Sequence, residues 1–357
     1  MKYFILIMSL VLLMEWNTYD ANTELGIAPC VYSGYYDPQG YYCDNEPMDT
    51  VWLPINCTSF VYDAGVSFND QSVNKLNTDH ECNIKCLLRF NPQLYLYLSY
   101  DKTQCTADAA DNTNYVLANI NHILDTYNIT GFILLNLDLG SSVNCDDKLI
   151  QYVNLIKQNT SRQIGLYVNA GNIIDYTNNA TATGWFDFEK LNNLMEYYII
   201  GFEMFNPCSD LYKGGIVPLN NVQDNTHSLT TFANAMNNSK IAKDKIYLQF
   251  SVSPTINNTS TENLPNCCVT YQKYCENDHY NRYWCADNAD SLYQKGKFAR
   301  DIHAKGIVVK YIDTIDRAAT CDCNNKDSFI TFSMMLRGYV NKDPIKDCAK
   351  LNNITDT

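Results

Sequence analysis

The sequence predicts an α/β fold, a single (β/α)8 TIM barrel with a Cys-rich loop insertion between strands 7 and 8. Three observations support this prediction. The length of 357 residues suits one large barrel, eight short apolar runs are rich in β-forming residues, and most stretches between them carry a helical pattern. Strands that alternate with helices form βα units and a parallel sheet. Eight such units indicate a closed barrel with its active face at the C-terminal ends of the strands.

The predicted strands and helices follow one another along the chain. The strands cover 29–36, 57–66, 94–100, 131–138, 163–170, 197–205, 245–252 and 306–313. Between them, 107–127, 147–158 and 291–306 place apolar residues three and four positions apart, which predicts amphipathic helices. Gly306 is expected to stop the last of these helices.

Residues 1–21 are predicted to be a secretory signal peptide. Lys2 is followed by an apolar run that is too short to span a bilayer. Because no second run of about 18 apolar residues follows, we expect a secreted, extracellular protein without a membrane anchor. The barrel domain then covers 22–357, and its insertion, 253–288, contains four cysteines.

Charge and cysteine content restrict the partners. A net charge of −13 repels nucleic acid and anionic membranes, so we expect neither as a partner. Fifteen cysteines fit an oxidising compartment, and their odd number leaves at least one thiol free or paired with another chain. Cys82 and Cys86, one helical turn apart, are expected to form bridges to neighbouring loops.

Candidate N-glycosylation sites are the sequons that begin at Asn159, Asn179, Asn237, Asn257 and Asn353. Asn56 and Asn128 also begin sequons. Asn128 lies just before a predicted strand and is expected to be too enclosed for modification.

No metal or cofactor site is expected. The group Cys267, Cys268, Cys275, His279 and Cys285 superficially resembles a zinc site, but in a secreted chain it indicates a disulfide-stapled loop. The five histidines show no metal spacing, and the sequence has no phosphate-binding loop or dinucleotide fingerprint.

Several stretches together resemble glycoside hydrolase family 18, the chitinases and chitinase-like lectins, over nearly the whole mature length. The stretch "PCVYSGYYDPQG" (29–40) is similar to the first strand of the family, "NCTSFVYDAGV" (56–66) to the second, and "KGIVVKYIDTIDRAATC" (305–321) to the eighth. The resemblance implies a disulfide between Cys30 and Cys57. It also implies that the usual insertion domain of the family is reduced here to the Cys-rich loop.

The fourth strand decides the predicted activity. The family signature there is Asp-Gly-x-Asp-x-Asp-x-Glu, in which the Glu protonates the glycosidic oxygen and the preceding Asp holds the acetamido group of the substrate. Aligned without gaps, this sequence places Thr130, Ile133, Leu135 and Leu137 at the four acidic positions. On this register the mouth of the barrel is lined with aliphatic side chains. Loss of the general acid costs about 10²–10⁴-fold in rate.

A second register stays open. Polar side chains at a barrel mouth are expected to point inward, which would place Leu134, Asn136 and Asp138 inside. This requires one extra residue after Gly131. Asn136 would then replace the orienting Asp and Asp138 the acid, with a side chain one methylene shorter than Glu. Both registers predict little or no hydrolysis.

Other predicted site positions also differ from the family pattern. The sixth strand, Met-x-Tyr-Asp in the family, offers Glu203, Phe205 and Asn206, and Phe205 lacks the hydroxyl that would bind the sugar. The Trp that ends the eighth strand is replaced by Lys310, followed by Tyr311. Lys310 is expected to pair with Glu203 or with Asp138 across the mouth, or to leave Glu203 solvated.

Aromatic residues near the first strand are a further candidate for binding. The chain has 27 tyrosines, and Tyr32 and Tyr36 belong to a group near the C-terminal end of that strand. A tyrosine offers a ring face and a hydroxyl, which suits a sugar. The alternative, which we favour, is that the tyrosines pack between elements.

By resemblance, 328–339 would form the last helix.

The predicted function is a secreted, catalytically inactive chitinase-like protein that binds a glycan, such as a chitooligosaccharide, or a protein partner. One alternative is an active glycosidase on N-acetylglucosamine polymers that uses Asp138 or Glu203. Another is an interaction scaffold without a sugar site, present as a disulfide-linked homodimer. None of these requires a cofactor.

Overall fold

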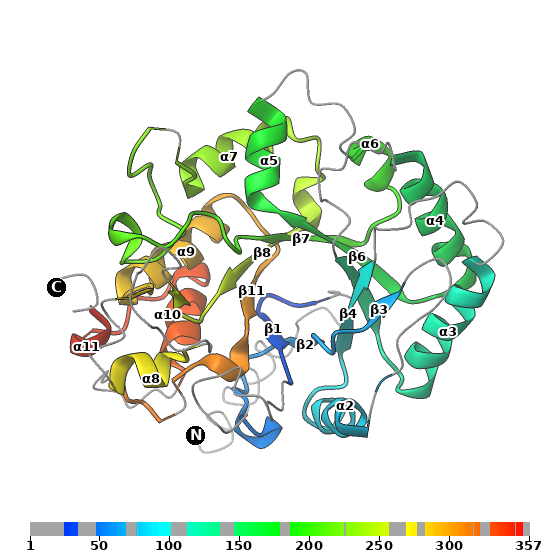
Figure 1. Cartoon of the computed structure of the whole chain (residues 1–357), viewed down its shortest axis with the longest axis horizontal. Helices are drawn as coiled ribbons and strands as arrows, with labels where there is room; N and C mark the ends of the chain where they lie inside the picture. The colour runs from blue at the N-terminus through cyan, green and yellow to red at the C-terminus, as the bar shows by residue number, and fades with distance from the viewer. Residues whose placement is uncertain are drawn as a thin grey trace, which may run out of the picture.

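The structure is a computed structural model, and it describes residues 25–34, 48–68, 76, 78–100, 113–135, 146–178, 186–224, 226–256, 269–276, 283–316, 318–321, 329–346 and 348–352. Within these ranges the chain forms a closed barrel of parallel strands with helices around it (Figure 1). The predicted fold class is confirmed.

Eight parallel strands close the barrel. They are β1 (Pro29–Tyr32), β2 (Ser59–Tyr62), β4 (Leu94–Tyr100), β5 (Gly131–Leu135), β6 (Gln163–Asn169), β7 (Tyr197–Gly201), β8 (Ile246–Ser251) and β11 (Gly306–Lys310). Each strand pairs with the next one in this order, and β11 pairs with β1 to close the ring. All eight predicted strands are therefore present, and several end earlier than predicted, among them β1, β2, β7 and β11.

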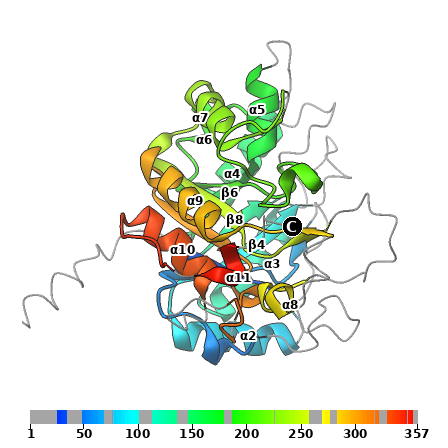
Figure 2. The same ribbon diagram turned by 90° about the vertical axis from the view of Figure 1, so that its left-hand side faces the viewer.

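Helices cover the outside of the barrel. They are α2 (Thr78–Phe90), α3 (Thr113–Thr126), α4 (Asp146–Asn159), α5 (Ala170–Asn178), α6 (Phe188–Leu191), α7 (Leu229–Asn238), α9 (Ala289–Asp301) and α10 (Ile330–Tyr339). The last two pack side by side (Figure 2). In the described part of the chain, none of the helices combines the length and hydrophobicity needed for a membrane span.

Short elements complete the described chain. They are η1 (Thr50–Trp52), β3 (Ser67–Phe68), η3 (Asp210–Tyr212), η4 (Lys243–Lys245), β9 (Thr255–Ile256), α8 (Tyr271–Glu276), β10 (Trp284–Cys285), η6 (Ile312–Thr314) and α11 (Ala349–Asn352). Strands β9 and β10 form a small antiparallel pair, and together with α8 they lie between β8 and α9 in sequence.

The prediction that Gly306 stops a helix was wrong. Helix α9 ends at Asp301, where the N–H of Ile302 caps two carbonyls, and Gly306 is the first residue of β11. A Cβ on Gly306 would lie 2.6 Å from the carbonyl oxygen of Ile27, so the glycine is needed for close contact between backbones.

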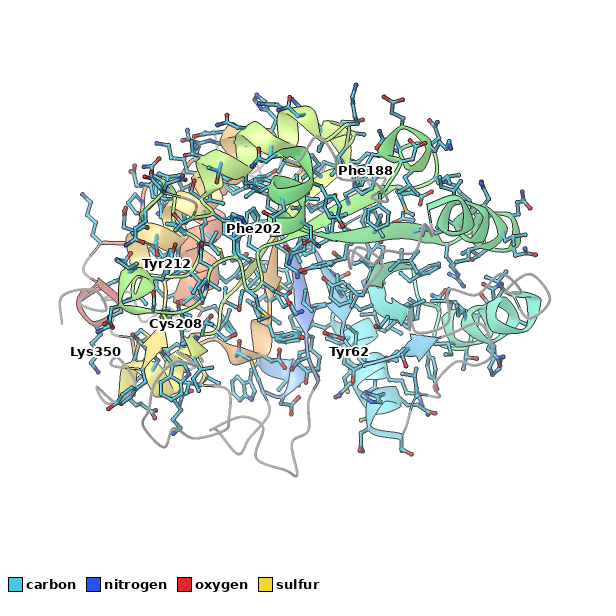
Figure 3. All side chains as sticks on the ribbon, turned by 45° about the horizontal axis from the view of Figure 1, so that its top comes forward. Tyr62, Phe188, Phe202, Cys208, Tyr212 and Lys350 are labelled. Carbon is cyan, nitrogen blue, oxygen red and sulfur yellow. A yellow bond between two sulfur atoms is a disulfide. The ribbon has the colours of Figure 1, made fainter. Side chains whose placement is uncertain are left out.

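Alternation along the strands divides the buried side chains into an outer and an inner core. The outer core lies between the strands and the helices, and Phe202 is one of its members (Figure 3). Its ring stacks on Phe250 with centroids 4.9 Å apart and meets Phe232 edge-on at the same distance. The inner core fills the barrel, and its buried members are Leu25, Val31, Val61, Tyr95, Tyr97, Ile133, Tyr197, Ile199, Tyr247 and Val308.

Tyrosines fill much of the barrel, where branched aliphatic residues usually dominate. Glycines make room for two of them. A Cβ on Gly165 would lie 2.1 Å from the ring of Tyr197, and a Cβ on Gly201 would lie 2.0 Å from Oη of Tyr167. The hydroxyl of Tyr95 donates to Oε1 of Gln163 at 2.8 Å, so ring and hydroxyl are both satisfied inside the protein.

Candidate functional site

The C-terminal ends of the strands bring polar, aromatic and apolar side chains together at one opening, which we call the mouth. These side chains occupy inward-facing strand positions or contact residues that do. They are Asp63, Tyr97, Leu135, Tyr167, Glu203, Gln249, Lys310 and Tyr311. Active sites of (β/α)8 barrels lie at this end of the strands.

Strand β5 presents aliphatic side chains to the inside of the barrel. Ile133 is fully buried in the inner core, and Leu135 packs against that core from the mouth. Phe132 and Leu134 belong to the outer core instead. Up to Leu135 the strand therefore has the orientation of the gap-free register, and Leu134 does not face inward as the second register requires. Residues 136–138, which include the predicted Asn136 and Asp138, lie outside the described residues.

A chain of polar contacts crosses the mouth. The hydroxyl of Tyr97 donates to Oε1 of Gln249, and Nε2 of Gln249 donates to Oε1 of Glu203 at 2.8 Å. Nζ of Lys310 lies 2.7 Å from the same Glu203 oxygen. Burial, followed by the nearby charge of Glu203, raises the pKa of Tyr97 well above its ordinary value, so its hydroxyl remains a donor. Of the two partners predicted for Lys310, Glu203 forms the ion pair, and Asp138 lies outside the described residues.

Aromatic rings surround the ammonium group of Lys310. Its Nζ lies 4.8 Å from the ring centroid of Tyr311 and 5.9 Å from that of Tyr97, distances at which a ring face attracts a cation. The hydroxyl of Tyr311 donates to Oδ2 of Asp63 at 2.7 Å. The peptide bond between Lys310 and Tyr311 is cis. The two side chains of the Lys310–Glu203 ion pair differ in exposure: that of Lys310 is 13 % exposed and that of Glu203 is 34 % exposed.

A third carboxyl group, Asp313, joins the ends of the first and eighth strands. The N–H of Ser33 donates to its Oδ1 at 3.1 Å, and the Ser33 hydroxyl donates to its Oδ2. Burial raises the pKa of Asp313, although the hydrogen bonds from Ser33 oppose this shift. Asp313, Asp63 and Gln249 were not predicted as site residues, although each is polar and lies within or just after an apolar strand.

The described mouth therefore offers ring faces, hydroxyl groups and carboxyl groups that already have partners. Asp63 accepts from Tyr311, Glu203 from Gln249 and Lys310, and Asp313 from Ser33. Among the described residues, no cluster of three or more histidine, cysteine or acidic side chains is suited to holding a metal ion.

Comparisons with solved structures place this geometry among known folds. Catalytic domain 2 of the Group II chitinase of Ostrinia furnacalis superimposes with a TM-score of 0.70 and 12 % identity, over 92 % of this chain and 100 % of that domain. Human YKL-39, described as a pseudo-chitinase with retained chitooligosaccharide binding, superimposes with a TM-score of 0.63 and 12 % identity, over 88 % of this chain and 99 % of its own. The protein has the fold of the GH18 chitinases.

Similarity to the chitinase fold is found at the level of structure. No protein-family model matches the sequence, and the search of curated proteins found no match. An active chitinase from Trichuris suis also superimposes, with a TM-score of 0.62 and 14 % identity over 87 % of this chain and 98 % of its own. The same fold therefore accommodates both a hydrolase and a pseudo-chitinase, and the side chains at the mouth must distinguish them.

Two predicted binding residues, Tyr32 and Phe205, lie away from the mouth of this chitinase fold. Tyr32 is buried in the outer core, and its hydroxyl donates to the carbonyl of Met48. Phe205 is also in the outer core, next to Phe202. These contacts do not favour a role in sugar binding. Tyr36 lies outside the described residues.

Asn206 joins parts of the loop that follows β7. Its Nδ2 donates to the carbonyls of Ile216 and His227, and its Oδ1 accepts from the N–H of His227 and the hydroxyl of Tyr212. These four bonds use the whole capacity of a carboxamide. Asn206 is 5 % exposed and fully bonded within this loop, which does not favour a role in sugar binding.

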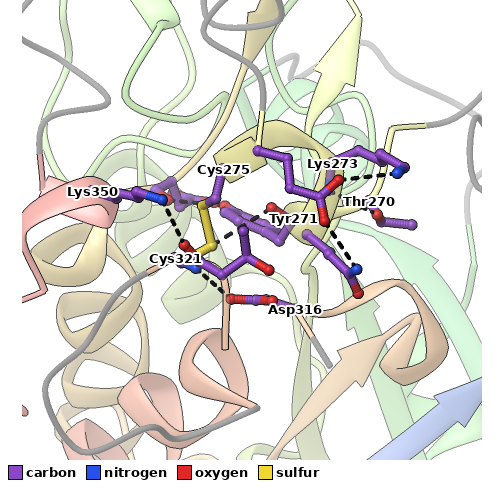
Figure 4. The surroundings of a disulfide bond; sticks show 11 residues. Thr270, Tyr271, Lys273, Cys275, Asp316, Cys321 and Lys350 are labelled. Carbon is purple, nitrogen blue, oxygen red and sulfur yellow. Dashed lines mark hydrogen bonds and ion pairs between the residues drawn. A yellow bond between two sulfur atoms is a disulfide. The ribbon is translucent and has the colours of Figure 1, made fainter. Parts of the chain in front are cut away.

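Disulfides hold the chitinase fold at its loops. The predicted Cys30–Cys57 bond is present and joins the neighbourhoods of β1 and β2. Two more bonds, Cys208–Cys285 and Cys275–Cys321, attach the Cys-rich insertion to the loops after β7 and η6. Figure 4 shows the second of these beside Asp316. The prediction of a stapled loop is confirmed at these two cysteines of the insertion.

The prediction that Cys82 and Cys86 form bridges was wrong. Both are free thiols on α2, with Cys82 exposed and Cys86 half-buried. Spacing along a helix identifies residues that share a face, but it does not supply a partner in the right place.

The sequons differ in whether the structure describes them. Asn159 and Asn237 lie near the ends of α4 and α7 and are exposed, as a glycan requires. Asn128 is also exposed, contrary to the expectation that it is enclosed, because it lies in the turn before β5 with a positive φ of 51°. Asn179, Asn257 and Asn353 lie outside the described residues.

Proposed function

We propose that the protein is a secreted chitinase-like protein that binds a glycan of the chitooligosaccharide class at the mouth of its barrel without hydrolysing it. The observation that carries this proposal is the inward orientation of Ile133 and Leu135 on β5. In the gap-free register these two positions correspond to acids of the family signature.

The absence of hydrolysis follows from the chemistry of proton transfer. Cleavage in this family needs a positioned carboxylic acid that protonates the leaving oxygen, and an aliphatic side chain has no proton to give. Glu203, one candidate for this acid, is engaged by two partners, since it forms an ion pair with Lys310 and accepts a hydrogen bond from Gln249. In the alternative function, an active glycosidase, Asp138 remains the other candidate for the acid.

Glycan binding is supported by the rings and hydroxyls at the mouth. Tyr311 and Tyr167 are only partly buried, so part of each residue is accessible to a ligand. Sugar rings pack on aromatic faces and form hydrogen bonds to hydroxyl and carboxylate groups. The Ostrinia furnacalis domain has been solved in complex with a chitooligosaccharide, and YKL-39 has been solved in the presence of chitooligosaccharides.

Calorimetric titration with chitohexaose tests the proposal. We expect saturable binding to the wild-type protein and about a tenfold loss of affinity in Tyr311→Ala, since losing one aromatic platform costs about 1 kcal/mol or more. Tyr311→Phe separates the ring from the hydroxyl that donates to Asp63. Trp52→Ala is the matched control, because Trp52 is a 59 % exposed aromatic residue on η1, outside the mouth.

Two results would contradict the proposal. One is a complete lack of binding at millimolar chitohexaose. The other is an equal loss of affinity in Tyr311→Ala and Trp52→Ala, which would indicate nonspecific contact with exposed rings.

A further inference from the structure

The exposed face of α2 carries a free thiol between two opposite charges. Cys82 is a free, exposed thiol near the middle of the helix. Asp79 lies three residues before it and Lys85 three residues after it, and both are exposed. The only ion pair described for Lys85 is with Glu81, at 3.6 Å on the same helix, and exposed pairs of this kind contribute little to stability.

This charge pattern is complementary to itself. If two copies of α2 pack antiparallel about a two-fold axis through Cys82, Asp79 of one copy faces Lys85 of the second, and the reverse pair forms on the other side of the axis. Residues on a two-fold interface meet in such reciprocal pairs. The two Cys82 side chains then meet on the axis itself.

Exposed apolar side chains lie in and just after η1, the segment that contacts α2. Helix η1 packs against α2. In this segment Val51 is 67 % exposed, Trp52 is 59 % exposed and Ile55 is 88 % exposed. Large apolar side chains grouped on a surface mark interaction sites. They would add apolar contact area beside the paired helices.

We propose that two copies of this chain associate through α2 and η1 and are linked by a disulfide bond between their Cys82 residues. The described chain already contains three disulfides, so it folds where an oxidant is available. A disulfide oxidant such as oxidised glutathione completes the step by exchange. One Cys82 thiolate attacks it and releases glutathione, and the second Cys82 thiolate then displaces a second glutathione to form the new bond.

Incubation of the full chain with oxidised glutathione, followed by non-reducing electrophoresis and light scattering, tests the proposal. We expect a species of twice the monomer mass that returns to monomer with dithiothreitol. Cys82→Ser abolishes this species, whereas Cys86→Ser, the matched control on the same helix, retains it. Lys85→Glu slows its formation about tenfold, because two attractions per dimer become repulsions. The double variant Asp79→Lys/Lys85→Asp restores the rate.

Three outcomes would overturn the proposal: a wild-type chain that stays monomeric, a Cys82→Ser chain that still dimerises, or a rate that is unaffected by Lys85→Glu. Circular dichroism of each variant confirms that it folds, which the exposure of Cys82 and Lys85 leads us to expect. Chitohexaose binding is measured in parallel. Because α2 lies outside the mouth, dimerisation and glycan binding can fail independently.

Discussion

The ion pair between Glu203 and Lys310 makes the most detailed prediction. We consider Glu203→Gln, Lys310→Met and the double variant, because these substitutions remove a charge while keeping a side chain of similar length. In Glu203→Gln, the 13 % exposed Lys310 loses its counter-charge, while the rings of Tyr97 and Tyr311 stay beside it. In Lys310→Met, the more exposed Glu203 keeps the hydrogen bond from Gln249.

The magnitude follows from distance and exposure. At 2.7 Å and an effective dielectric constant of about 20, the gross attraction between the charges is about 6 kcal/mol. Desolvation of Lys310 and solvent screening at the 34 % exposed Glu203 cancel most of this attraction. We therefore expect a net coupling of about 1–2 kcal/mol. Glu203→Gln should destabilise by about 2 kcal/mol and Lys310→Met by about 1 kcal/mol, since Lys310 is the more buried partner.

Guanidinium unfolding of the four proteins measures this coupling as a double-mutant cycle. The double variant should be more stable than the sum of the single effects predicts, by the coupling energy. Guanidinium is itself a salt, so a urea series in low salt serves as the control for screening. Single effects that add to within about 0.3 kcal/mol would refute the reasoning, because the two groups would then not interact across the mouth.

Three further predictions concern the frame of the barrel. Gly201→Ala should destabilise by about 2–3 kcal/mol, because the added Cβ forces Tyr167 out of its place in the barrel. Asp316→Asn should flatten the pH dependence of stability. Burial raises the pKa of Asp316, so the folded state binds a proton more tightly than the unfolded chain does. The protonated carboxyl group therefore stabilises the fold below a pH of about 4. This stabilisation is lost as the pH rises through the folded-state pKa. Replacing both Cys275 and Cys321 by serine should cost up to about 4 kcal/mol, from the loop of 46 residues that the bond closes.

Urea unfolding with matched controls checks each of these predictions. Gly65→Ala tests backbone strain without overpacking, since Gly65 has a φ of 62° but open space around its Cβ position, and it should cost only about 1 kcal/mol. An equal effect in Gly201→Ala would exclude the steric explanation. If Asp316→Asn and the wild type lose stability in parallel between pH 4 and 7, Asp316 is not the titrating group. A serine variant at Cys275 and Cys321 as stable as the wild type would assign the stability of the insertion to packing.

Much of the barrel could be predicted from the sequence because a closed parallel barrel imposes a simple pattern. Strands buried on both faces read as continuous apolar runs, and this placed all eight strands. The ends of the strands were less certain. In β7 the predicted run continues to Phe205, but the strand ends at Gly201, after which the chain leaves the sheet. Beyond that point alternation no longer fixes direction, so Phe205 and Asn206 could not be assigned to the correct side.

The mouth was predictable where two strand ends face each other. Glu203 follows the end of β7 and Lys310 is the last residue of β11, and charges of opposite sign at one end of a barrel are expected to meet. The position of Gln249 between Tyr97 and Glu203 depends on the register among β4, β7 and β8, which the sequence does not state.

The tyrosines illustrate a different limit. From the sequence we favoured packing over sugar binding as the role of the many tyrosines. The rings of Tyr95, Tyr197 and Tyr247 indeed pack edge-on inside the barrel. That a tyrosine fits there depends on a glycine on the neighbouring strand, such as Gly165 beside Tyr197. Such complementarity between strands distant in sequence appears only after the register is known.

The rate of chitooligosaccharide cleavage is the measurement that tests the central claim most directly. Purified protein incubated with chitohexaose, with products resolved by chromatography, should release no shorter oligomers above the buffer control, because the inward side chains of β5 are Ile133 and Leu135. Turnover at the rate of an active chitinase assayed beside it, and its loss in Asp138→Ala or Glu203→Gln, would contradict the claim and identify the acid.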